Sequence, residues 1–102
     1  MNNKRVKLPL ARPGETLRED FLLPLQMSVS RLALELRVPV TRMNDIVRGR
    51  RSITAGTALR LARYFGTSPQ FWINLQTNYE LERAQDAIGS EIVSQVKPRR
   101  AA

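Results

Sequence analysis

The sequence contains no histidine and no cysteine, and these two absences exclude several kinds of catalytic and structural chemistry. Without histidine there is no imidazole base, and without cysteine there is neither a thiolate nucleophile nor a disulfide framework. The nine acidic residues are scattered, and Glu80 and Glu82 do not share a helix face. No carboxylate cluster suggests a metal site. We therefore expect that the protein is not an enzyme, such as a small nuclease, and that it binds no cofactor or metal.

Long apolar runs are also missing, so no segment of the sequence is expected to span a membrane. The first residues are polar and basic with no apolar region behind them, which gives no sign of a signal peptide. We expect a protein of the bacterial cytoplasm with no membrane partner, located at the nucleoid when it is bound to DNA.

Acidic residues are few beside basic ones: 17 Lys and Arg against 9 Asp and Glu give a net charge of +8. Fourteen of the 17 are Arg, whose forked guanidinium suits phosphate and guanine. Between Arg37 and Arg63 there are seven Arg and one acid, whereas four acids and one base lie between Glu80 and Glu91. The charge indicates a polyanionic partner. DNA is one candidate partner. The alternatives are an RNA-binding surface, binding to an anionic membrane surface, and a charge that serves solubility alone.

The stretch from Ser28 to Val47 predicts two short helices joined by a tight turn. Ser28 is suited to begin the first helix, because its hydroxyl can accept a bond from a free backbone N–H. The first helix ends before Pro39, which suits the start of the second. Arg37 stands where many such turns carry glycine, so the turn either bears about 1 kcal/mol of strain or has another conformation. This pattern is a helix-turn-helix, whose second helix enters the DNA major groove.

The outward face of the second helix, at about 40–48, has the side chains that read base edges. Arg pairs with guanine, Asn with adenine, and the methyl groups of Thr and Val contact that of thymine. The predicted base contacts are Val40, Thr41, Arg42, Asn44, Asp45 and Arg48. Arg50 and Arg51 follow in a turn and are suited to phosphate contact. The alternative is an ordinary solvated helix face.

The remaining chain completes an all-α, five-helix prediction. Residues 1–12 form a basic arm that either lies along DNA or serves solubility, 13–89 form the domain, and 90–102 form a tail whose apolar residues dock on a partner or on the domain. A first helix runs from Pro13 to about Leu23, a fourth from Ser52 or Thr54 to Gly66, and a fifth from Pro69 to about Ala87, with Gly89 as its end.

Two further side-chain expectations concern the fourth and fifth helices. Phe71 and Trp72 are expected in the core rather than in an aromatic binding platform. Arg60 and Arg63 are expected on a solvated face.

Three blocks of sequence together resemble the HigA-type antitoxins of bacterial toxin–antitoxin systems, within the Xre (phage repressor and Cro-like) superfamily. The blocks are the PGE opening at 13–15, VRGRRSITAGTALRLARYFGTS at 47–68 and FWINLQ at 71–76. The resemblance covers roughly residues 12–87 and implies a five-helix, lambda-repressor-like domain. It further implies a homodimer that binds palindromic operator DNA to repress its own operon, and an antitoxin that inhibits a HigB/RelE-like toxin that cleaves mRNA.

The resemblance also implies residue roles. Thr41, Arg42, Asn44 and Asp45 would face bases, with Arg48 at the edge of the groove. Phosphates would be met by Ser28, Ser30 and Arg31 at the start of the preceding helix and by Arg50 and Arg51. Asp45 would repel a phosphate, so it must accept a hydrogen bond from cytosine or bond a neighbouring Arg. A stand-alone regulator without a toxin would carry the same DNA-facing residues, and its gene would lack an adjacent toxin gene.

Overall fold

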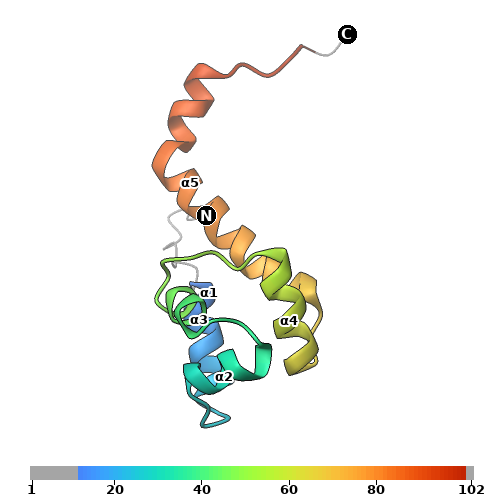
Figure 1. Cartoon of the computed structure of the whole chain (residues 1–102). Coiled ribbons are helices and arrows are strands. Elements are labelled where there is room, and N and C mark those ends of the chain that lie inside the picture. Colours follow the sequence, from blue (N-terminus) through green and yellow to red (C-terminus); the bar gives the residue numbers. More distant parts are fainter. Residues whose placement is uncertain (1–11, 101–102) are drawn as a thin grey trace, which may run out of the picture.

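The computed structural model describes residues 12–100, and every regular element within that range is helical (Figure 1). The first helix begins as α1 and continues without a break as the π-helical segment η1, so the described residues form the predicted five helices. The elements are α1 (Pro13–Thr16), η1 (Leu17–Leu22), α2 (Val29–Leu36), α3 (Val40–Val47), α4 (Ala55–Phe65) and α5 (Pro69–Gln95). None of the helices between residues 12 and 100 is long and apolar enough to cross a bilayer.

Hydroxyl side chains begin three of the helices, as the sequence predicts. Ser28 Oγ accepts the N–H of Arg31 at 3.0 Å, and Ser68 Oγ accepts that of Phe71 at 3.1 Å. Of the two candidates for the start of α4, Thr54 is the cap. Each such cap contributes about 1 kcal/mol, because it satisfies a backbone donor that the helix leaves free.

A single apolar core joins the helices, and Trp72 is its largest fully buried side chain. Its indole nitrogen donates to Thr67 Oγ1 at 2.7 Å, so the buried polar atom is satisfied. Phe21 lies 4.9 Å, centroid to centroid, from both Trp72 and Phe65. The prediction of core packing is confirmed for Trp72 but is wrong for Phe71, whose ring lies nearly perpendicular to the indole at 4.9 Å between centroids and stays 37% exposed.

The first helix packs against the end of α3 without any side chain between them. A Cβ built on the buried Gly14 would meet the carbonyl oxygen of Ile46 and would lie 2.6 Å from that of Val47. Only glycine allows two backbones to approach this closely. The PGE opening therefore fixes where the C-terminal end of α3 sits.

The last helix is longer than predicted, and the expectation that Gly89 ends it is wrong. α5 continues through Gly89 to Gln95, so residues 90–95 of the predicted tail are helical. An internal glycine costs only about 1 kcal/mol relative to alanine, and the helix formers around it outweigh that cost. The helix stops just before Lys97-Pro98, where proline disfavours the α conformation of the preceding residue. In Figure 1 the second half of α5 extends away from the other helices.

Candidate nucleic-acid interface

The turn between α2 and α3 has the geometry that glycine usually supplies. Arg37 has φ 60° and ψ 43°, in the left-handed region, which settles the two alternatives in favour of the strained turn. Its N–H donates to Leu34 O at 3.2 Å, and the next N–H, of Val38, donates to Ala33 O at 3.1 Å. These bonds satisfy carbonyls at the end of α2 and direct the chain into α3.

Arg60 holds the same turn from outside the motif. Its Nη1 donates to the carbonyl oxygen of Leu36 at 2.7 Å, in a partly buried position. Arg60 is exposed, as expected, but its guanidinium also binds the end of α2, a role that was not predicted. Sequence spacing missed this role because the two residues lie 24 positions apart and only the packing of α4 on α2 brings them together.

On α3, the helical period separates a buried face from a face that is free to contact a ligand. Met43 and Ile46 are at most 1% exposed and hold the helix on the core. The opposite stripe, at spacings of three and four residues, contains Thr41, Asn44, Asp45 and Arg48. Val40 and Arg42 lie at the two edges of this stripe. Val40, Thr41 and Arg48 are exposed, whereas Arg42, Asn44 and Asp45 are half-buried.

Asp45 has a neighbouring cation in Arg50. Its carboxylate lies 3.9 Å from Arg50 Nη1, and its carbonyl oxygen accepts the N–H of Arg50 at 2.7 Å. Of the two expectations for Asp45, the structure provides the bond to a neighbouring Arg. An exposed pair of this length contributes at most about 1 kcal/mol, so the contact orients the two side chains more than it stabilises the fold.

The predicted phosphate-contacting residues of α2 lie together at its first turn. Ser28 accepts the N–H of Arg31 through its oxygen, which leaves its O–H free to donate to another acceptor. Ser30 is exposed. Arg31 Nη2 is 2.7 Å from Glu35, one turn further on, and the guanidinium remains largely exposed. A phosphate would therefore share Arg31 with Glu35.

The turn that carries Arg50 and Arg51 is fastened to α5. Gln76 accepts the N–H of Ile53 through Oε1 at 2.9 Å and donates through Nε2 to Glu80 Oε2 at 2.9 Å. Ser52 Oγ donates to the same Glu80 oxygen at 3.0 Å. These bonds position the two cations immediately after α3. One sequence signal points to this role, since Gln76 is a polar residue in a block that is otherwise expected in the core.

Acidic side chains do not gather into a metal site anywhere in residues 12–100. The described part of the chain thus presents a helix-turn-helix with a polar stripe on α3, hydroxyl groups and Arg31 at the start of α2, and two anchored arginines after α3. This arrangement defines the class of helix-turn-helix DNA-binding folds. A helix-turn-helix family model matches residues 17–72 of the chain.

Relatives and solved structures make the assignment more specific. Virulence-associated protein I of Dichelobacter nodosus is 51% identical over 79 residues, which are 78% of this chain and 73% of that protein. The Pseudomonas aeruginosa antitoxin HigA, solved with the higBA promoter, is 45% identical with a TM-score of 0.86, covering 89% of this chain and 99% of that one. A HigA-family antidote protein from Coxiella burnetii is 43% identical with a TM-score of 0.86, covering 90% of this chain and 100% of that one.

The chain belongs to the HigA family of antitoxins, with a helix-turn-helix domain of the Xre type. Membership of this family agrees with the expectation that the protein is not an enzyme.

Proposed function

We propose that this protein is a cytoplasmic antitoxin that binds an operator in its own promoter as a homodimer and inhibits a HigB/RelE-like toxin. The observation that carries the DNA-binding part is the α3 stripe beside the anchored Arg50–Arg51 turn. The similarity to an antitoxin solved with its promoter supports it further. Thr41, Arg42, Asn44 and Arg48 are the proposed readers of base edges, with Val40 at the edge and Asp45 holding Arg50.

Backbone contacts are proposed on both sides of α3. Ser28, Ser30 and Arg31 would bind phosphates at the start of α2, and Arg50 and Arg51 would bind them after α3. Contacts of this kind fix the register of the protein on the duplex but do not read its sequence. They also make affinity fall with salt, because each phosphate that is neutralised releases counterions.

The second half of α5 supports the dimer. Leu81, Ile88 and Ile92 are 63%, 44% and 46% exposed, and they are separated by seven and four residues. This spacing places them on one side of the helix, as in the seam of a coiled coil. We propose that two α5 helices cover these stripes in the dimer. The two α3 helices would then meet successive major-groove faces, one helical turn or about 34 Å apart.

Two measurements test the proposal. Binding of the purified protein to the upstream region of its own gene is compared with binding to a random duplex of equal length. We expect clear preference for the upstream region. Co-expression with the tagged product of the adjacent small open reading frame, followed by pull-down and a growth assay, tests the antitoxin part. Operator binding without complex formation or growth rescue would leave a stand-alone regulator.

The dimer is tested by Ile88→Asp, which places a charge on the proposed seam. We expect light scattering to give a dimer for the wild type at micromolar concentration and a monomer for the variant. A wild-type monomer under these conditions would contradict the two-fold arrangement. Ser90→Asp, at an exposed position of the same helix on the side opposite the Leu81–Ile88–Ile92 stripe, is the matched control and should remain dimeric.

A further inference from the structure

A polar hollow of about 240 Å³ lies between the start of α1, the turn after α3, and α5. Four arginines from these three parts of the chain line it: Arg12, Arg50, Arg51 and Arg83. Glu80 is the acidic residue in the lining, so the formal charge around the hollow is four minus one, or +3. Two of these arginines already belong to the proposed DNA contacts, whereas Arg12 and Arg83 lie outside the helix-turn-helix.

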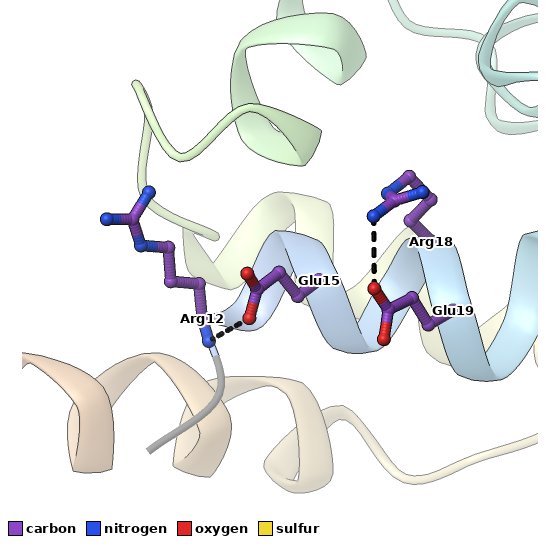
Figure 2. Close-up of polar contacts among 4 residues, drawn as sticks. All are labelled: Arg12, Glu15, Arg18 and Glu19. Carbon is purple, nitrogen blue, oxygen red and sulfur yellow. Dashed lines mark hydrogen bonds and ion pairs between the residues drawn. The ribbon is translucent and has the colours of Figure 1, made fainter. Parts of the chain in front are cut away.

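Arg12 uses its backbone and its side chain for different purposes. Its N–H donates to Glu15 Oε1 at 3.3 Å, while its guanidinium points away from that carboxylate (Figure 2). The guanidinium reaches the turn after α3, because Arg12 Nη1 would lie 3.6 Å from a Cβ built on Gly49. A cation from the start of α1 is thus placed next to the residue that precedes Arg50.

Arg83 approaches the hollow from α5. Its guanidinium carbon lies 5.6 Å from the centroid of the Tyr79 ring, one helical turn earlier, and this cation–π contact favours a defined direction for a long side chain. The Glu80 carboxylate next to it already accepts hydrogen bonds from Ser52 and Gln76 through one oxygen. Glu80 therefore holds the turn in place and offsets only part of the positive charge.

We propose that this hollow binds the DNA backbone beyond the helix-turn-helix, with Arg12 and Arg83 as additional phosphate contacts. The inference rests on the proposed DNA-binding function. Guanidinium groups match phosphate oxygens through paired hydrogen bonds, and bringing four of them together is unfavourable until an anion separates their charges. The hollow also opens at the C-terminal end of α3, so a strand that borders the groove read by α3 passes beside it. Arg83 would couple the α5 dimer helix directly to the DNA.

The test compares Arg12→Gln, Arg83→Gln and the control Arg63→Gln in the full-length protein. Arg63 is an exposed arginine of α4 that lines a different groove, so its variant has the same loss of charge away from the hollow. Affinity for the upstream region and for a random duplex is measured by fluorescence anisotropy at several salt concentrations. Circular dichroism and light scattering establish that each variant is folded and keeps the wild-type oligomeric state.

For each hollow variant we expect weaker binding to both duplexes and a shallower dependence of log affinity on log salt. The slope should fall in magnitude by about 1.8, which is about 0.9 for each of the two subunits. Arg83→Lys should restore most of the slope, because it restores the charge. Arg63→Gln should match the wild type.

A wild-type slope in both Arg12→Gln and Arg83→Gln would overturn the proposal. If Arg83→Gln changes the oligomeric state, the salt slope of Arg12→Gln alone tests the proposal, since Arg12 lies outside α5. Loss of toxin capture with unchanged DNA binding would also overturn it, by assigning the hollow to an acidic segment of a protein partner. Failure of the wild type to prefer its upstream region would count against the proposed function alone, because phosphate contact is measurable on the random duplex.

Discussion

Replacing Gly14 with alanine should destabilise the protein although alanine is the better helix former. The added methyl group would meet the backbone carbonyls of Ile46 and Val47, and backbone atoms cannot rotate aside as a flexible side chain can. The start of α1 must therefore move away from α3. Overpacking of this kind costs about 1–3 kcal/mol, which exceeds the gain of at most about 1 kcal/mol in helix propensity.

Gly56→Ala is the matched control for this substitution. Gly56 lies in the first turn of α4, and a Cβ built there has no heavy atom within 4 Å. The control should be neutral or should stabilise the protein by about 0.4–1 kcal/mol, because alanine has fewer unfolded conformations to lose. The two variants make the same chemical change and are expected to have opposite effects.

Thermal and urea unfolding followed by circular dichroism would measure both variants at one protein concentration, because dimerisation makes the midpoint depend on concentration. For a domain of this size, each kcal/mol corresponds to roughly 4–8 °C in Tm. Gly14→Ala should also weaken DNA binding, since Arg48, Arg50 and Arg51 follow the end of α3 that α1 positions. Stability within about 0.5 kcal/mol of the wild type would refute the argument that backbone contact fixes the two helices.

Three other substitutions test separate parts of the site. Arg37→Gly should stabilise the protein by about 1 kcal/mol, because glycine has no Cβ to strain the left-handed turn, and a lower urea midpoint would show that the Arg37 side chain contributes more than the strain costs. Asn44→Ala should reduce the preference for the operator over random DNA by about 1–3 kcal/mol in competition binding, and equal preference would remove Asn44 from base reading. Gln76→Leu leaves the buried N–H of Ile53 without its partner and should cost about 1–3 kcal/mol in urea unfolding, whereas unchanged stability would mean that the turn does not depend on this bond.

Local features of the chain were predictable because they depend on residues close in sequence. Ser28, Thr54 and Ser68 mark helix starts through bonds to N–H groups three positions later, and Gly66, at φ 77°, ends α4 as expected. The face of α3 followed from its period alone. The sequence also indicated the left-handed turn at Arg37, although a conformational alternative stayed open there.

Features that depend on distant residues were not predictable in this way. The bond from Arg60 to the end of α2, the fastening of the Ser52 turn by Gln76, and the contact of Gly14 with α3 each join segments more than 20 positions apart. No local pattern specifies such a pair. The length of α5 differs from the prediction for a local reason, because the helix formers around Gly89 outweigh the cost of one glycine and the helix ends only near the downstream proline.

The sequence by itself thus determined the helical class, the family, the polar stripe of α3 and the excess of positive charge, because these follow from composition, period and motif spacing. The tertiary structure decided which cations lie together. Arg12, Arg50 and Arg83 are far apart along the chain, and they line one hollow only because α1 packs on the end of α3 and the following turn is bound to α5. The sequence gives the number of positive charges, and the packing of the helices decides where on the surface they lie.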